Sequence, residues 1–172
     1  MTELLNGFFG IPFWSVFADF HGMLSMLSLI LFGVALTLYF FSEKTKSALG
    51  WLKTTLLLLF CDILLLDIFG LTVYIPYRAE GGAKFDLVGS ETTAWLHTIV
   101  FEHKEFLAFA PLIMTAVAFF VVTKLGENFV DKEKYKWLRL AVLASLILSL
   151  IFVLTVAAEA VLVTKAAPVG GR

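Results

Sequence analysis

The sequence predicts an all-α integral membrane protein, folded as an up-down bundle of four transmembrane helices. Hydrophobic residues make up 60% of the 172 residues and charged residues only 16%, and the mean hydropathy is +0.92. A soluble domain of this size has too little interior to bury so much apolar surface. Four separate apolar runs are each long enough to cross a bilayer, which takes about 20 residues of helix.

The spans follow one another in a single membrane domain that covers residues 1–172. We expect them at about 20–41, 51–74, 104–124 and 138–163, with polar connections at 42–50, 77–93 and 126–139. Residues 1–20 are aromatic but interrupted by glycine and proline, so we expect an interfacial segment there. Short connections make successive helices antiparallel neighbours, which predicts the up-down topology.

The third helix is too long for the membrane if it is continuous. Ser90 resembles a helix cap and precedes an acidic turn, yet a helix from Ser90 to Leu125 would be about 50 Å long. We therefore expect its first turns to project from the bilayer, or the helix to break before His103. Pro111 predicts a kink near Leu107, and Pro76 is expected to end the second helix.

Basic residues predict the orientation. The first and third connections, with their flanks, carry eight basic residues: Lys44, Lys46, Lys53, Lys124, Lys132, Lys134, Lys136 and Arg139. The other side carries five: Arg78, Lys84, Lys104, Lys165 and Arg172. Because cytoplasmic connections are richer in Lys and Arg, we expect both termini outside a bacterial or archaeal inner membrane.

Several function classes are disfavoured. The formal net charge of −1 provides no basic field for a nucleic acid. Cys61 is the only cysteine, and no histidine neighbours it in its helix, so a nucleophilic catalytic group is absent. A small transporter or channel would usually show a repeat or discontinuous helices, and neither is evident apart from the proline in the third span.

The three histidines fall on the same, predicted outer, side. His21 and His103 belong to different helices at similar depth, and such a pair can ligate one b-type haem iron from both faces. Ser25 and Ser28 follow His21 on the same helical stripe, which favours an inward face for His21. The alternative is that these histidines simply meet headgroups and water.

His97 lies six residues before His103. On a continuous helix the two side chains point about 120° apart, so they would not share one metal unless the helix breaks. His97 could instead contact a haem propionate or a neighbouring ligand. The sequence thus predicts haem b as cofactor, with His21 and His103 as metal ligands.

A non-haem metal is a second possibility. Nitrogen and oxygen ligands occur at similar depth in six residues: Asp19, His21, Glu102, His103, Glu105 and Glu159. Zinc, iron or copper accept such mixtures, although no di-iron spacing is present.

Carboxylates inside the spans are the other unusual feature. Asp62 lies near mid-membrane, Asp67 lies further outward, and Glu159 lies in the outer part of the fourth span. An unpaired charge there is costly, so we expect Asp62 to be protonated, to face a partner subunit or to line a hydrated path. The functional interpretation is a proton path coupled to a quinone or redox centre. The structural alternative is a hydrogen bond to Ser145 or Ser149.

These features together resemble a known group. A span opens with histidine (FHGMLSMLSLILFG), an acidic span follows, another is introduced by histidine (EHKEFLAFAPLIMTAVAFF), and the last ends AAEAVLVTKAAPVGG. This order is similar to that of small four-helix bacterial membrane proteins of unknown function, some suspected of binding haem. Gly22 and Met23 stand where that group has proline and a second histidine, and Ala157 and Ala158 replace its paired glycines.

The sequence therefore favours a membrane-embedded b-type haem electron-transfer subunit of a respiratory or redox complex. The alternatives are a haem-free accessory subunit of a larger membrane complex and a small proton-coupled membrane protein. Expected partners are the lipid bilayer and other membrane subunits, together with a quinone or a cytochrome.

Overall fold

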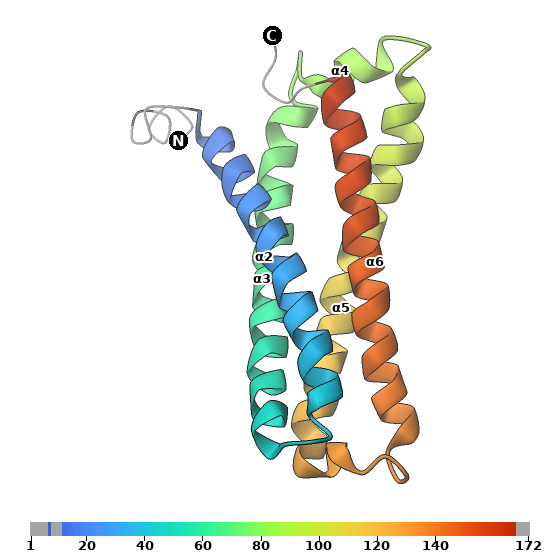
Figure 1. The fold of residues 1–172 in the computed structure, drawn as a ribbon. Helices are drawn as coiled ribbons and strands as arrows, with labels where there is room; N and C mark the ends of the chain where they lie inside the picture. Colours follow the sequence, from blue (N-terminus) through green and yellow to red (C-terminus); the bar gives the residue numbers. More distant parts are fainter. Residues whose placement is uncertain (1–6, 8–11, 168–172) are drawn as a thin grey trace.

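The computed structural model describes residue 7 and residues 12–167, and over this part the chain is all-α (Figure 1). Its long helices are α2 (Phe13–Phe41), α3 (Lys46–Arg78), α5 (Glu102–Leu125) and α6 (Lys136–Ala166). Shorter elements are α4 (Ala83–Val88), the π-helical segment η1 (Leu96–Phe101) and the 3-10 helix η2 (Gly126–Val130). Four helices in the described part of the chain are long and apolar enough to cross a membrane. They are α2, α3, α6 and the continuous helix formed by η1, α5 and η2. The predicted four-helix membrane fold is confirmed.

All four long helices extend beyond the predicted spans, α2 and α3 by the most residues. α2 begins at Phe13, directly after Pro12, because no helix breaker separates Phe13 from the first span. The rest of the expected interfacial segment, 1–6 and 8–11, lies outside the described residues. α3 continues through Pro76 to Arg78, so the prediction that Pro76 ends this helix is wrong. A proline near the last turn removes only one backbone hydrogen bond.

The third helix changes its winding before His103. The Ser90 carbonyl accepts the amides of Thr93 and Ala94 at the start of this helix, while the Ser90 hydroxyl lies 2.8 Å from that of Thr92. The helix then continues through η1, a π-helical segment, into α5. The chain is therefore helical without interruption up to His103, and the expected break is replaced by a widened, π-helical turn.

The connection between α3 and α4 depends on two glycines. Gly81 has a φ of 72°, a region that residues with a Cβ rarely adopt. A Cβ on Gly82 would lie 2.4 Å from the Pro76 carbonyl oxygen. The chain can therefore fold straight back over the end of α3, and α4 lies within the segment 77–93, which was predicted to be a polar connection.

The bundle is closed at one end and splayed at the other. We call these the Arg139 end and the α4 end. α2 packs along α3 and α5 along α6, whereas α2 touches α6 only sparsely, and Figure 1 shows α2 leaning away from α6 towards the α4 end. The main apolar cluster includes Phe32, Leu52, Leu56, Leu59, Val122, Phe129 and Leu146, each fully buried.

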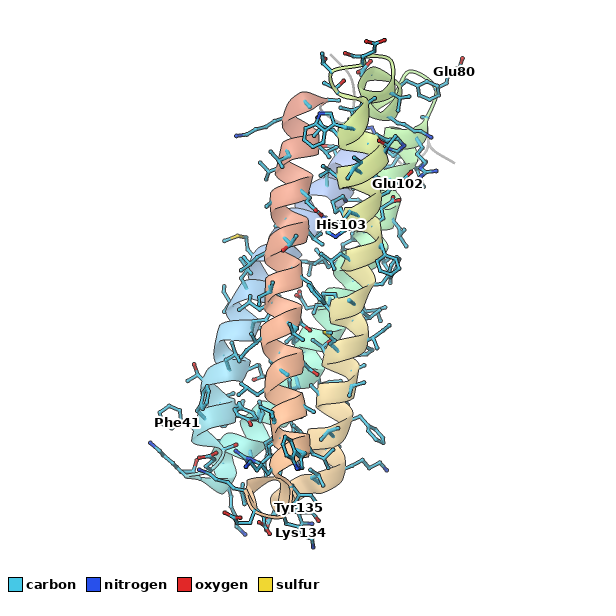
Figure 2. All side chains as sticks on the ribbon, turned by 90° about the vertical axis from the view of Figure 1, so that its right-hand side faces the viewer. Phe41, Glu80, Glu102, His103, Lys134 and Tyr135 are labelled. Atoms are coloured by element: carbon cyan, nitrogen blue, oxygen red, sulfur yellow. The ribbon has the colours of Figure 1, made fainter. Side chains whose placement is uncertain are left out.

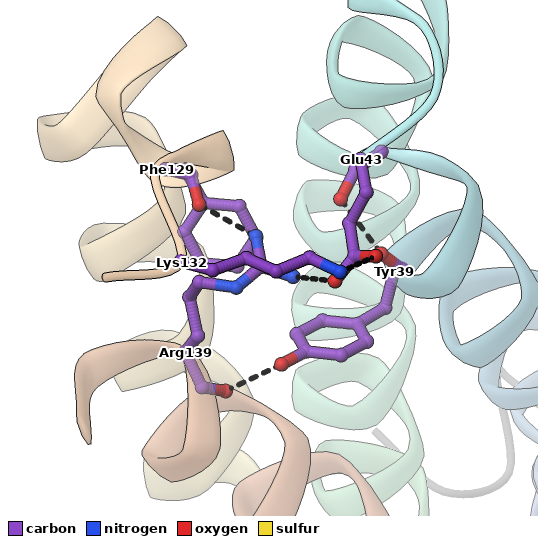
Figure 3. Close-up of polar contacts among 6 residues, drawn as sticks. Tyr39, Glu43, Phe129, Lys132 and Arg139 are labelled. Carbon is purple, nitrogen blue, oxygen red and sulfur yellow. Dashed lines mark hydrogen bonds and ion pairs between the residues drawn. The ribbon is translucent and has the colours of Figure 1, made fainter. Parts of the chain in front are cut away.

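Arg139 closes its end of the bundle (Figure 3). Its guanidinium donates to the Phe129 carbonyl at 2.6 Å and to the Glu43 carboxylate at 2.5 Å. The Tyr39 hydroxyl donates to the Arg139 carbonyl at 2.9 Å, and Lys132 also pairs with Glu43. These contacts tie α2 to the η2–α6 connection, so this half of the bundle is tightly packed.

Candidate functional site

A partly open cavity of about 540 Å³ lies between the four long helices in the α4 half of the bundle. Its wall is mostly apolar, and small residues such as Gly70, Ala157 and Ala160 leave the space. Its polar lining residues are His21, Ser25, Asp67, Tyr74, Lys104 and Glu105. A large apolar cavity with few polar groups is typical of a small-molecule site.

The rim of the cavity includes apolar side chains that are also exposed on the outside of the bundle. Met26 is 64% exposed, Leu71 56% and Phe109 47%. In a membrane these surfaces face lipid, because the bundle is apolar at this depth. A molecule dissolved in the bilayer therefore has a route to the cavity.

His21 is the one histidine among the residues that line this cavity. Its Nδ1 lies 3.0 Å from the main-chain carbonyl oxygen of Leu66. Because a carbonyl only accepts, Nδ1 carries the proton in this contact and Nε2 keeps a free lone pair. No other described group forms a hydrogen bond with Nε2. The ring lies against Gly70 on α3, where a Cβ would be 3.0 Å from Cε1 of the imidazole.

Two ionisable side chains without an ion-pair partner in the described chain line the cavity from different helices. Asp67 on α3 has a buried carboxylate oxygen, Oδ2, that lacks a hydrogen-bond partner in the described chain. Lys104 on α5 forms no ion pair with a described residue, and its Nζ lies 4.7 Å from the centre of the Phe101 ring. Glu105, in contrast, lies 3.9 Å from Arg78. The cavity thus offers an amine and a carboxyl group that the protein does not pair with each other.

A second hollow of about 130 Å³ adjoins the cavity and shares His21, Gly70, Tyr74 and Lys104 with it. Three aromatic rings lie beside it. Tyr77 stacks on Phe101 at 4.1 Å and 7°, and Tyr74 stacks on Phe101 at 5.5 Å. The stack covers the α4 side of the hollow, where polar loops begin.

His97 supports this aromatic cover. It is 5% exposed, and its Nδ1 lies 2.8 Å from the hydroxyl of Tyr77, which is 2% exposed. The contact satisfies two polar groups that would otherwise be buried without partners. His97 lines neither hollow.

His103 faces α6 rather than the cavity (Figure 2). Its Nδ1 lies 2.6 Å from a carboxylate oxygen of Glu159, and its side chain is 53% exposed. It is not among the lining residues of either hollow, so the structure does not bring His21 and His103 together there. Their joint ligation of a haem stays a prediction.

The six candidate ligands for a non-haem metal are dispersed. Within the described part of the chain, no three His, Cys, Asp or Glu side chains group as a metal site would require. His21 faces α3, whereas His103 pairs with Glu159 between α5 and α6.

The three candidate proton-path carboxylates have different surroundings. Asp62 accepts a hydrogen bond from Ser28 on α2 at 2.5 Å. The expected structural hydrogen bond is therefore present, but with Ser28 rather than with Ser145 or Ser149. Asp67 lines the cavity and Glu159 pairs with His103, so the three do not line one hollow.

Sequence reasoning did not single out Lys104, Tyr74 or Tyr77 as site residues. A signal for Lys104 was present: Lys104, Ala108 and Pro111 recur at helical spacing and all three line the cavity. The positions of the tyrosines depend on where α4 and η1 fold back, and no local pattern predicts that.

No family model, no curated protein and no solved structure matches this chain. The functional argument therefore rests on the cavity and the residues around it.

Proposed function

We propose that the protein is a membrane subunit of a redox complex and that its cavity binds an isoprenoid quinone. The observation that carries this proposal is a mostly apolar cavity with a lipid-facing rim, into which His21 Nε2, Asp67 Oδ2 and the Lys104 ammonium bring polar atoms without a hydrogen-bond or ion-pair partner in the described chain. A quinone likewise combines a polar part, the two carbonyl groups on its ring, with a long apolar tail.

The lining residues suit both redox states of the headgroup. The Lys104 ammonium can donate to a quinone carbonyl, and the Asp67 carboxylate and the His21 Nε2 can accept from a quinol hydroxyl. Oxidation of a quinol releases two electrons and two protons. In this scheme the electrons pass to one-electron carriers in partner subunits, and His21 and Asp67 receive the protons.

Binding of a short-chain quinone analogue to the purified protein in nanodiscs tests the proposal. We expect saturable binding that weakens about tenfold or more in His21→Ala and in Asp67→Asn, since a lost hydrogen bond to a buried polar group costs about 1–3 kcal/mol. Asp86→Asn, on α4 outside the cavity, is the matched control and should bind normally. Absence of saturable binding by the folded wild type would contradict the proposal.

A b-type haem in the same cavity is the second candidate, favoured by His21. A histidine that ligates a metal usually donates its other ring nitrogen to a carbonyl or carboxylate, and His21 is oriented in this way by Leu66. Lys104 has the charge to hold a propionate. His21 could supply one axial ligand to a haem in this cavity; a second bond from His103 would require that side chain to leave Glu159.

A reduced-minus-oxidised absorbance spectrum separates the two candidates. If haem is bound, His21→Ala should abolish the spectrum, His97→Ala should retain it, and loss of the low-spin form in His103→Ala would indicate ligation from both faces. An intact wild-type protein without a Soret band would contradict the haem candidate and leave the quinone proposal standing. Failure of both experiments would favour a haem-free accessory subunit.

A further inference from the structure

The small hollow of about 130 Å³ connects the cavity with the α4 end of the bundle. It shares His21, Gly70 and Lys104 with the cavity, together with one tyrosine of α3. Beyond this junction its lining includes Tyr77 in the last turn of α3 and Thr164 in the last turn of α6, neither of which lines the cavity. The two spaces therefore meet at His21, and the smaller one continues to the ends of two helices.

The hollow reaches the surface at Thr164. This residue is exposed, whereas Tyr77, Phe101 and Val163 are buried and form the wall. Lys165 follows Thr164 directly, as expected where a span meets the polar boundary of the membrane. The opening therefore lies beside the aromatic stack, on the side of the bundle where α2 and α6 touch only sparsely.

The hollow has the size and the polar groups to hold a short chain of water molecules. One water takes about 30 Å³ in the liquid and needs about two to four polar partners, so about 130 Å³ accommodates several. Polar partners lie at both ends: His21 and Lys104 at the cavity, and the Thr164 hydroxyl at the surface. Hydrogen-bonded water of this kind can carry a proton.

The orientation of His21 lets one ring nitrogen both take up and release a proton. Nδ1 lies 3.0 Å from the Leu66 carbonyl and donates to it, so Nε2 carries the free lone pair. A quinol hydroxyl in the cavity can give its proton to Nε2, which forms an imidazolium that keeps its bond to Leu66. Loss of the Nε2 proton to water in the hollow then restores the neutral ring.

His21 is the group at the junction that can accept a proton. Of the ionisable side chains around it, Asp67 and Glu105 line the cavity alone, whereas Tyr74 and Lys104 also line the hollow. An ammonium has no lone pair, and a phenol is a weak base. Within the described chain, α2 and α6 contribute no further ionisable side chain to either lining. A proton that passes from the cavity into the hollow is therefore relayed by His21.

The opposite direction is largely closed by apolar side chains. Ile63 and Val153 line the cavity and belong to the main apolar cluster, which continues to Phe129 at the Arg139 end. Apolar walls offer water no hydrogen-bond partners. Four leucines of this cluster are fully buried: Leu52, Leu56, Leu59 and Leu146.

We propose that the small hollow is the proton exit of the quinol site, through which the proton that His21 takes up leaves to the water on the α4 side. This proposal rests on the proposed quinone function. Each quinol loses two electrons and two protons and becomes the quinone. The electrons pass to one-electron carriers in partner subunits, one proton goes to His21, and the other goes to Asp67. In the predicted orientation, the proton from His21 is released outside.

Exchange of the His21 ring proton with water tests this exit without any bound ligand. Nuclear magnetic resonance of ¹⁵N-labelled histidine rings in nanodiscs measures how fast the Nε2 proton of the protonated ring exchanges with water, and His21→Ala assigns the signal. We expect Val163→Phe to slow this exchange about fivefold or more, because Val163 walls the hollow and the larger ring fills it. Val161→Phe is the matched control on the same helix. Residue 161 is 52% exposed and lines neither space, so exchange should match the wild type.

Thr164→Val keeps the test decisive if Val163→Phe folds poorly. Valine has the shape of threonine without the hydroxyl, so exchange should slow while the fold is retained. Neither variant should weaken binding of the quinone analogue, since residues 163 and 164 do not line the cavity. A wild type that binds the analogue but exchanges the His21 proton no faster than both variants would overturn the exit and leave the quinone proposal standing. A folded wild type without saturable analogue binding would overturn both.

Discussion

The imidazole of His21 lies directly against Gly70, on the neighbouring helix α3. An added Cβ at Gly70 would be 3.0 Å from Cε1 and 3.4 Å from Nδ1 of the ring. The same ring contacts the Leu66 carbonyl, one turn away on α3. The absence of a side chain at residue 70 therefore sets both the orientation of His21 and the width of the cavity.

Gly70→Ala should displace the His21 ring by a few tenths of an ångström and lengthen its hydrogen bond to Leu66. We expect weaker binding of the quinone analogue, or of haem if haem is the ligand, with the fold retained. The matched control is Gly33→Ala, because a Cβ at Gly33 meets no atom within 4 Å. Equal affinities of the two variants would contradict this account of Gly70.

Arg139→Met should strongly destabilise the Arg139 end. The buried guanidinium pairs with Glu43 and the Phe129 carbonyl, and removal of one partner from a buried pair costs about 3–5 kcal/mol. Because Glu43 is partly exposed and keeps Lys132, we expect the lower part of this range. Reversible unfolding in mixed micelles measures it. Lys46→Met is the control, since its pair with Glu127 is exposed to solvent and contributes little to stability.

Tyr77→Phe should loosen the aromatic cover without removing the stacked ring. The change leaves buried His97 Nδ1 without its 2.8 Å partner, at a cost of about 1–3 kcal/mol. Hydrogen exchange of the η1 amides should accelerate. Tyr135→Phe, at the opposite end, should leave η1 unchanged. If both variants exchange alike, the Tyr77–His97 contact does not hold the cover in place.

Cysteine labelling tests the predicted orientation in a Cys61→Ser background. Ser47→Cys and Asp131→Cys should react with an impermeant reagent from the cytoplasmic side, because the basic connections favour that side. Glu80→Cys should react from outside, and Figure 2 shows Glu80 at the end opposite Lys134 and Tyr135. Glu80 is used because Gly82 cannot accept a side chain. Labelling of all three from one side would refute the up-down topology.

Local sequence was sufficient for the membrane fold. Hydropathy is a property of each segment alone, and a bilayer forces each apolar segment to satisfy its backbone as a helix. The four spans and their antiparallel order were therefore predictable, whereas the break expected before His103 is a π-helical turn in a continuous helix. The ends of the helices were harder to predict. α3 continues past Pro76 because a proline near the last turn removes only one backbone hydrogen bond.

The site was only partly predictable. The inward face of His21 followed from its stripe with Ser25, and His21 does line the cavity. The hydrogen-bond partner of Asp62 could not be predicted from the sequence, because Ser28 and Ser149 both lie on inward faces of their helices. The packing of α2 along α3 makes Ser28 the partner.

The sequence by itself determined that this chain spans a membrane four times and holds titratable groups within its helices. The tertiary structure decided which of these groups meet. Each helix can rotate about its axis without changing its hydropathy, so the direction of His103 towards Glu159 and of Lys104 into the cavity was fixed only by packing. The splay of α2 from α6, which opens the cavity, likewise arises from side-chain contacts between helices distant in sequence.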